Sequence, residues 1–258
     1  MKILLLGSAG QVGWELQRSL APLGQLVALD RRSTDFCGDL SSAQGLADTV
    51  HRTRPDVIVN AAAYTAVDKA ESDSATAHAV NAVAPGVLAE AANRVGAWLV
   101  HYSTDYVFDG SGSTPWVETD PTGPLSVYGK TKLEGEQRVA DACARHIILR
   151  TSWVYAARGG NFAKTMLRLA GERDRLTVVN DQFGSPTGAD LLADVTAHIV
   201  RSALAESTPD AAGTYHLAAA GETSWHGYAQ FVVGEALKAG RLLKASPDTV
   251  DPVPASAF

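Results

Sequence analysis

The sequence predicts an α/β protein: a doubly wound parallel sheet of Rossmann-like type with a smaller C-terminal lobe. Apolar runs of four to six residues alternate with longer segments of helical period. Such alternation implies βαβ units and hence a parallel sheet covered on both faces. A glycine-rich turn also follows the first apolar run and opens the first helical segment. Right-handed crossovers between such units give the doubly wound arrangement.

Each expected strand is a short apolar run, and each expected helix is a longer segment with helical periodicity. The expected strands of the first part are Lys2–Leu6, Leu26–Leu29, Val57–Asn60, Trp98–Ser103 and Ile147–Arg150. The expected helices between them are Gln11–Leu20, Leu46–Arg52, Ala75–Val95 and Ser126–Ala142. Later in the chain we expect a helix over Asp190–Ala205, a strand over Thr214–Ala218 and a helix over Trp225–Ala239.

Composition and charge exclude several classes of protein. The 258 residues carry a net charge of −6 with a pI near 5.6. A nucleic-acid-binding protein would present a basic face instead. No stretch approaches the ~18 consecutive apolar residues of a membrane span. Cys37 and Cys143 lack metal-ligand or redox-motif spacing, so we expect two reduced thiols in a cytoplasmic protein. A homodimer is compatible with the sequence, which does not fix the oligomeric state.

The turn after the first strand has the spacing of a dinucleotide-binding loop. Gly7 would allow a tight turn, Gly10 would let the backbone approach a diphosphate, and Gly13 would permit close helix–strand packing. The helix N-terminus, at Gln11 and Val12, would present N–H groups and a positive dipole end to the phosphates. A purely structural turn is the alternative, but the position between an N-terminal strand and a helix favours a dinucleotide.

The end of the second strand carries charges of both signs. Asp30 could accept hydrogen bonds from the adenosine ribose, which favours NAD. Arg31 and Arg32 could pair with the 2′-phosphate of NADP. We therefore expect use of both NADH and NADPH, and a solvated charge cluster is the alternative. Asp39 and Leu40 follow a short polar connection and could flank the adenine.

Small side chains follow the strand that ends at Asn60. They would let a flat ring or a ribose lie against the backbone, although close packing of a helix on the sheet also requires alanine. The residues expected to contact the cofactor here are Ala61, Ala62, Ala63 and Thr65.

A tyrosine and a lysine share one face of the helix expected over Ser126–Ala142. Tyr128 and Lys132 lie four positions apart, and an adjacent ammonium would lower the phenol pKa from its ordinary ~10. The pair follows a strand that ends in Ser103 and Thr104, at the edge where ligands bind in open α/β sheets. Thr104 could bind a substrate oxygen and share a proton relay with Tyr128. A Tyr–Lys match alone is weak, and a hydroxyl that caps a strand is common. Together with the glycine turn, these residues predict a nicotinamide-dependent proton-transfer site.

The later segments are expected to form the smaller lobe. Gly159–Gly160 and Asp181–Gly188 interrupt the alternation with turn residues. We expect residues 1–155, joined by 189–220, to form the dinucleotide-binding core. Residues 156–188 and 221–258 would form a substrate lobe.

With these residues in place, the chain resembles the extended short-chain dehydrogenase/reductase superfamily and, within it, the dTDP-4-dehydrorhamnose reductase family. The resemblance runs from Met1 to Phe258. It rests on the segments Gly10–Leu16, Asn60–Asp68, Ser103–Gly110, Tyr128–Gly135, Arg150–Tyr155, Asn161–Phe162 and Asn180–Thr187.

The resemblance implies a role for each matching residue. Tyr128 would donate the proton, and Lys132 would bind the cofactor and tune Tyr128. Thr104 would adjust the proton transfer and, with Asp105, contact the sugar. Trp153 would lie against the deoxysugar, with core packing as the alternative.

Further roles follow from the same resemblance. Asn161 and Lys164 would contact the diphosphate, and Asn81 would order water near Lys132. Mg²⁺ is associated with the family, but the sequence has no ligand cluster that requires a metal, and Glu15 is the one candidate ligand.

The implied activity is reduction of the C4 ketone of dTDP-4-dehydro-L-rhamnose by NADPH or NADH. The product would be dTDP-L-rhamnose, in the last step of a synthesis that serves cell-surface polysaccharide such as lipopolysaccharide. Family members usually continue beyond the position of Asp251–Phe258, so we expect the substrate lobe to be truncated.

Two other classes of function remain open. A cofactor-binding regulatory subunit on the same scaffold would lack turnover, and the Tyr128–Lys132 pair argues against it. A nucleotide-sugar epimerase or dehydratase is the second. A dehydratase commonly has an Asp-Glu pair beside the strand-end hydroxyl, whereas Asp105-Tyr106 follows Thr104 here.

Overall fold

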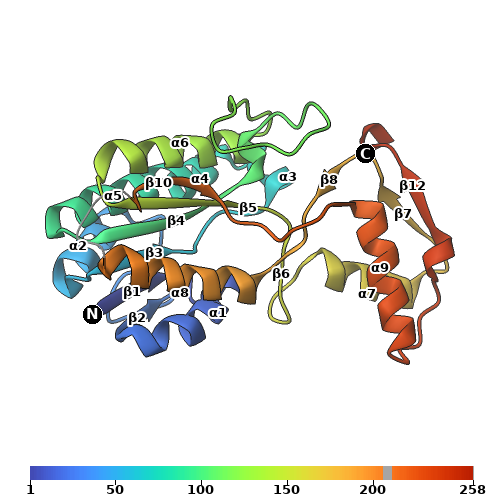
Figure 1. Ribbon diagram of the computed structural model, residues 1–258, viewed down its shortest axis with the longest axis horizontal. Coiled ribbons are helices and arrows are strands. Elements are labelled where there is room, and N and C mark those ends of the chain that lie inside the picture. Colours follow the sequence, from blue (N-terminus) through green and yellow to red (C-terminus); the bar gives the residue numbers. More distant parts are fainter. Residues whose placement is uncertain (206–210, 258) are drawn as a thin grey trace. The chain divides into compact units, whose positions relative to one another are not determined.

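The computed structural model describes residues 1–205 and 211–257, which form two compact units (Figure 1). The first unit comprises Met1–Thr151 and Asp190–Leu217, and the second comprises Ser152–Ala189 and Ala218–Phe258. The expected division at residue 155 falls slightly too late. Residues 152–155 belong to the second unit because strand β6 (Val154–Tyr155) pairs there with β9 (Thr187–Gly188).

A six-stranded sheet in the order β10-β5-β4-β3-β1-β2 forms the centre of the first unit. Every pairing in it is parallel, so the predicted doubly wound parallel sheet is confirmed. Its strands are β1 (Lys2–Leu6), β2 (Gln25–Leu29), β3 (Val57–Asn60), β4 (Trp98–Thr104), β5 (His146–Thr151) and β10 (Gly213–His216). Ile3 to Leu6 are fully buried, as expected for a strand covered on both faces.

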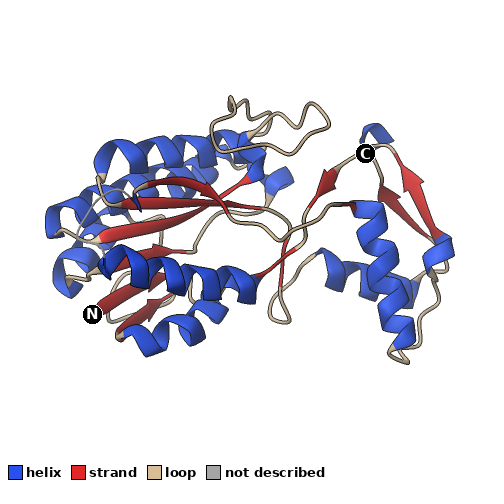
Figure 2. Cartoon of the chain, in the orientation of Figure 1, coloured by secondary structure: helices blue, strands red, loops and turns tan. Residues whose placement is uncertain are grey.

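Helices cover both faces of this sheet (Figure 2). The helices of the first unit are α1 (Gln11–Leu20), α2 (Ala43–Thr53), α3 (Val67–Ala70), α4 (Ser74–His78), α5 (Ala84–Val95), α6 (Val127–Ala142) and α8 (Ala189–Ala205). On one face α2, α5 and α6 pack side by side. On the other, α1 and α8 are joined through Asp194, which accepts hydrogen bonds from Arg18 (2.8 Å) and Ser19 (2.5 Å). Among the described residues, no helix combines the length and apolar character needed to cross a bilayer.

The helix expected over Ala75–Val95 is interrupted. Between α4 and α5 lies a π-helical turn, η2 (Ala79–Val83), in which the N–H of Ala84 bonds to the carbonyl of Ala79, five residues back. Pro85 has no N–H for the carbonyl four residues earlier, which favours a local change of hydrogen-bond pattern at this point. The other predicted helices and strands are confirmed, with ends displaced by at most three residues.

The described residues of the second unit form three two-stranded sheets, β11-β8, β12-β7 and β6-β9, and two α-helices. The remaining elements are α7 (Phe162–Glu172), β7 (Leu176–Val179), β8 (Phe183–Gly184), β11 (Thr223–Ser224), α9 (Trp225–Lys238) and β12 (Val250–Val253). Its core is formed by Met166 and Ala170 of α7, Ala229 and Val233 of α9, and apolar residues of β7 and β12.

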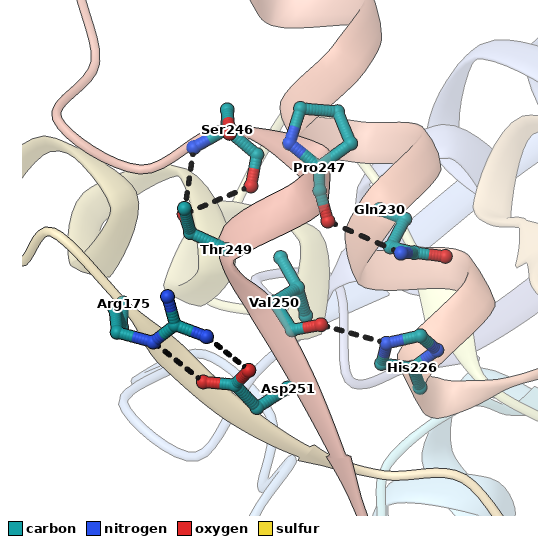
Figure 3. Close-up of polar contacts among 8 residues, drawn as sticks. All are labelled: Arg175, His226, Gln230, Ser246, Pro247, Thr249, Val250 and Asp251. Atoms are coloured by element: carbon teal, nitrogen blue, oxygen red, sulfur yellow. Dashed lines mark hydrogen bonds and ion pairs between the residues drawn. The ribbon is translucent and has the colours of Figure 1, made fainter.

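Polar contacts fasten β12 to its neighbours, as Figure 3 shows. The Asp251 carboxylate accepts two hydrogen bonds from the Arg175 guanidinium, and His226 of α9 donates to the Val250 carbonyl at 2.8 Å. Gln230 donates to the Pro247 carbonyl at 3.1 Å. The sequence analysis did not predict this strand, which is short and contains Pro252.

A buried ion pair joins α6 to the sheet. The Arg150 guanidinium of β5 binds the Glu136 carboxylate of α6 in a bidentate arrangement, with Nη2–Oε2 at 2.7 Å and Nε–Oε1 at 3.0 Å. The Arg150 and Glu136 side chains are only 8% and 5% exposed. Removal of one partner would leave the other charge buried without a counter-ion.

We expect Glu136→Gln to lower the free energy of unfolding by about 3 kcal/mol or more, because breaking a buried pair is far more destabilising than breaking an exposed one. Urea denaturation measures the loss. The matched control is Glu90→Gln, which breaks the exposed pair between Glu90 and Arg94 and should change stability by less than about 1 kcal/mol. Equal losses in the two variants would contradict a structural role for the buried pair.

Candidate active site

The glycine turn has the positive φ angle and the close backbone contacts that its glycine spacing predicts. Gly7 has a φ of +85°, and the N–H groups of Gly7 and Ser8 both donate to the Leu29 carbonyl, at 2.9 and 3.0 Å. A Cβ on Gly13 would lie 2.0 Å from the Gly7 carbonyl oxygen, so only glycine lets α1 begin against the turn. Gly10, at the N-cap, has no side chain to cover the first amides of α1. The turn therefore fits a diphosphate laid against backbone N–H groups.

The residues expected around the adenosine follow β2. The Asp30 carboxylate accepts a hydrogen bond from the backbone N–H of Arg32 at 2.7 Å, and Arg31 and Arg32 are exposed. The Asp39 carboxylate accepts from both the N–H and the hydroxyl of Ser41, each at 2.9 Å. The Leu40 side chain is 5% exposed and packs in the main core of the first unit.

The segment after β3 runs beside the glycine turn. The N–H of Ala61 donates to the Leu6 carbonyl at 3.0 Å, and a Cβ on Gly7 would lie 2.7 Å from the nitrogen of Ala62. Ala61, Ala62 and Ala63 are partly buried, and Thr65 is exposed. A glycine is thus required at position 7, where the turn passes the Ala62 backbone. The cofactor contact of the alanines stays a prediction.

Asn81 has a structural task in the same region. Its side-chain oxygen accepts from the Tyr64 N–H at 2.8 Å, and its amide nitrogen donates to the Tyr64 carbonyl at 3.0 Å and to Thr131 at 3.3 Å. The π-helical turn places this side chain between the β3 segment and α6. Its suggested role in ordering water near Lys132 stays a prediction.

Thr104, Asp105 and Tyr128 lie near the end of β4, with Thr104 and Tyr128 buried and Asp105 partly buried. Thr104 ends β4, and its hydroxyl donates to the Asp105 carboxylate at 3.0 Å and accepts from the Tyr106 N–H at 3.2 Å. Tyr128 lies in the first turn of α6, 8% exposed, with its ring edge-on to Tyr106 at 5.5 Å between centroids. Thr104 also lies close enough to Tyr128 to act on the phenol, whose pKa it lowers. The role of these residues in proton transfer stays a prediction.

Burial dominates the acid–base properties of this group. It raises the pKa of Tyr128 well above 10, against a smaller opposing effect of the hydrogen bond to Thr104. Burial also raises the pKa of Asp105 to about 6, while the hydrogen bond from Thr104 acts to lower it. The expected lowering of the Tyr128 pKa by Lys132 is not found, because the Lys132 nitrogen contacts other groups.

Lys132 is 2% exposed. Its Nζ donates to the Tyr102 carbonyl at 2.6 Å and lies 3.3 Å from Nε2 of His101, a β4 residue that the sequence analysis missed. Burial lowers the pKa of Lys132 to about 8, against the opposing charge of Glu136. The sequence pattern that could have identified His101 is the alternation of polar residues, His101 and then Ser103, in an otherwise apolar strand.

The side chains of Asn161, Lys164 and Trp153, which were expected to contact the substrate, interact with nearby residues of the second unit. Asn161 caps α7 by accepting from the Lys164 N–H at 3.1 Å, and the Lys164 ammonium donates to the Ala157 and Gly159 carbonyls.

Trp153 has a φ of +46°, and its ring stacks on Trp225 with 3.4 Å between centroids. Trp225 was not singled out from the sequence, and the sugar contact of Trp153 stays a prediction.

The donor set around Glu15 does not suit Mg²⁺. Its carboxylate lies 3.6 Å from the Arg18 guanidinium. Within residues 1–205 and 211–257, no group of three His, Cys, Asp or Glu side chains could hold a metal ion. We therefore assign no step of the chemistry to a magnesium ion at Glu15.

Comparison with known proteins gives a consistent result. Residues 1–258 match the family model described as the RmlD substrate binding domain. The chain is 61% identical to the dTDP-4-dehydrorhamnose reductase of Shigella flexneri over 260 residues, which cover 99% of this chain and 86% of that relative.

Solved structures of similar proteins agree with this. A dTDP-4-dehydrorhamnose reductase from Clostridium acetobutylicum superimposes with a TM-score of 0.88 at 36% identity, over 100% of this chain and 85% of that one. The Bacillus anthracis dTDP-4-dehydrorhamnose reductase in complex with NADP gives a TM-score of 0.85 at 34% identity, over 99% and 85% of the two chains.

The raised pKa of Asp105 predicts a pH dependence of stability. The folded protein binds this proton more tightly than the unfolded chain, whose carboxyl has a pKa of ~4. Its contribution is therefore fully present at low pH and is lost as the pH rises through about 6. Asp105→Asn should gain stability relative to the parent as the pH goes from about 4 to about 7. Unfolding titrations at several pH values measure that difference, and a difference independent of pH would refute the assignment.

Proposed function

Because the chain belongs to the dTDP-4-dehydrorhamnose reductase family, we propose that it reduces the C4 ketone of dTDP-4-dehydro-L-rhamnose with NADPH or NADH. The product is dTDP-L-rhamnose, and the reaction is the last step of its synthesis. The observation that carries this proposal is a continuous line of contacts from the glycine turn to the lysine. Gly7 packs against the backbone of Ala62, whose N–H donates a hydrogen bond to the Asn60 side chain. The Asn60 side chain contacts His101, and His101 contacts Lys132.

The residues of the first unit suit a nicotinamide cofactor, which would supply the hydride. In this proposal the turn from Gly7 to Gly13 holds the diphosphate, and Asp30 with Arg31 and Arg32 surrounds the adenosine ribose. Lys132 binds the nicotinamide ribose. The acid and the two bases after β2 support use of both NADH and NADPH, and the NADP complex of the 34% identical relative supports the second.

Tyr128 is the proposed proton donor. Burial keeps its hydroxyl protonated, so the proton is available when the C4 oxygen of the substrate acquires negative charge. Thr104 would bind that oxygen and stabilise the developing charge by turning toward it the hydroxyl hydrogen that Asp105 accepts in this structure. The buried surroundings strengthen these interactions because water competes poorly for them. Asp105 would help to hold the sugar.

Tyr128→Phe should keep cofactor affinity and lose about 10²–10⁴-fold in kcat, since only the proton transfer is removed. The assay is NAD(P)H oxidation with dTDP-4-dehydro-L-rhamnose, beside a cofactor titration. Tyr215→Phe, which removes the hydroxyl of an exposed tyrosine of β10, is the matched control and should leave both unchanged. A Tyr128→Phe enzyme within about threefold of the parent would exclude Tyr128 as proton donor.

The same assay separates the rival functions. A regulatory subunit would bind the cofactor without consuming it. An epimerase or a dehydratase would convert a nucleotide sugar with no net oxidation of NAD(P)H. Either result for the parent protein would contradict the proposed reduction.

A further inference from the structure

A buried polar layer lies between α6 and the sheet, around the Lys132 nitrogen. Asn60 and His101 face one another across the β3–β4 pairing, and both are 1% exposed. Nδ2 of Asn60 lies 3.1 Å from Nδ1 of His101, and Nε2 of His101 lies 3.3 Å from Nζ of Lys132. The three side chains form an uninterrupted chain of contacts away from solvent.

The orientation of the Asn60 amide is set by its other contact. Its side-chain oxygen accepts a hydrogen bond from the Ala62 N–H at 3.2 Å, so the amide nitrogen is the atom that faces His101. An amide nitrogen only donates. Nδ1 of His101 must therefore accept, and the proton of a neutral imidazole lies on Nε2. His101 is neutral because its burial holds its pKa well below 6.5.

This tautomer has a consequence for Lys132. The Nε2–H of His101 points at a nitrogen that already donates to the Tyr102 carbonyl at 2.6 Å. A neutral amine can accept the Nε2–H with its lone pair and still donate to Tyr102. An ammonium has no lone pair, so it would place an N–H against an N–H. The imidazole thus disfavours the charged form of Lys132.

The other groups near Lys132 do not cancel this effect. Glu136, one turn further along α6, favours the ammonium, but its carboxylate is shared with the Arg150 guanidinium. Tyr128, one turn back, is an uncharged phenol. The charge of Asp105 raises the pKa of Tyr128. No hydrogen bond between Lys132 and a carboxylate occurs among the described residues.

We propose that His101, held in its Nε2–H tautomer by Asn60, is a positioning residue that sets the protonation state of Lys132. The inference rests on the proposed function only in that Lys132 belongs to the same site. Together with burial, which lowers the Lys132 pKa to about 8, the imidazole makes Lys132 a proton-exchanging group near neutral pH and not a permanent cation. The reductase would then depend on pH through this lysine.

The first test uses the unaltered protein. Nitrogen-15 NMR of the histidine rings should give a protonated-type shift for Nε2 of His101 and an unprotonated-type shift for Nδ1. The Lys132 side chain, assigned by comparison with Lys132→Met, should titrate near pH 8. An Nδ1–H tautomer, or a Lys132 that titrates at the ordinary ~10.4, would overturn the proposal.

The second test reverses the tautomer. In Asn60→Asp a carboxylate oxygen can still accept from Ala62 and now also accepts Nδ1–H, so Nε2 would offer its lone pair to a Lys132 ammonium. The Lys132 pKa should rise by at least about one unit, or tenfold in proton affinity. The rise should be much smaller in a His101→Phe background, because the effect passes through the ring and not only through the added charge. An equal rise in both backgrounds, or none, would refute the relay.

The control and the kinetics separate this inference from the proposed function. His216→Phe alters another partly buried imidazole of the first unit and should leave the Lys132 pKa unchanged. The pH profile of kcat/KM, which reports groups of the free enzyme, should move upward in Asn60→Asp with the NMR titration. An NMR shift in a protein without reductase activity would refute the proposed function alone. Reductase activity with an unperturbed Lys132 would refute this inference alone.

Discussion

The nitrogen of Lys132 lies between α6 and β4, out of reach of solvent, and the candidate active site is arranged around it. A buried lysine requires partners, since an unpaired charge in such surroundings is strongly unfavourable. Here the partners are the Tyr102 carbonyl and the His101 ring. The one nearby carboxylate, Glu136, is paired with Arg150, and that pair also fixes α6 on the sheet. The ion pair that packs α6 on the sheet therefore also leaves Lys132 without a carboxylate partner of its own in the described part of the chain.

The parallel sheet positions the other residues of the candidate active site. Because β1, β3 and β4 run in the same direction, their carboxyl ends bring the glycine turn, the Asn60 segment and Thr104 to the same edge. The π-helical turn at Asn81 contacts both the Tyr64 backbone and Thr131 of α6. The first turn of α6, which carries Tyr128, is thereby held close to the end of β4. Such rigid support is what a proton-transfer site requires, because small displacements weaken catalysis.

The sequence was sufficient for features that depend on local spacing. The glycine turn, the Tyr128–Lys132 pair on one helix face, and the alternation of strands and helices all follow from short-range rules. It was not sufficient for the break in the helix at Ala79–Val83, where Pro85 opposes an otherwise good helical pattern. Nor could it give the partner of Lys132, because His101 lies 31 residues away in the chain and meets the lysine only through the packing of α6 on β4. The expected lowering of the Tyr128 pKa by Lys132 is not found, because burial raises that pKa.

In the proposed reaction, hydride reaches C4 of the sugar while Tyr128 supplies the proton. The most direct measurement follows a deuterium label from the transferable position of NADPH into the product, with dTDP-4-dehydro-L-rhamnose as substrate. NMR of the product should place one deuterium on C4 of the rhamnose ring, with one NADPH oxidised for each product formed. Product that lacks deuterium at C4, or product formed without oxidation of NADPH, would contradict the account.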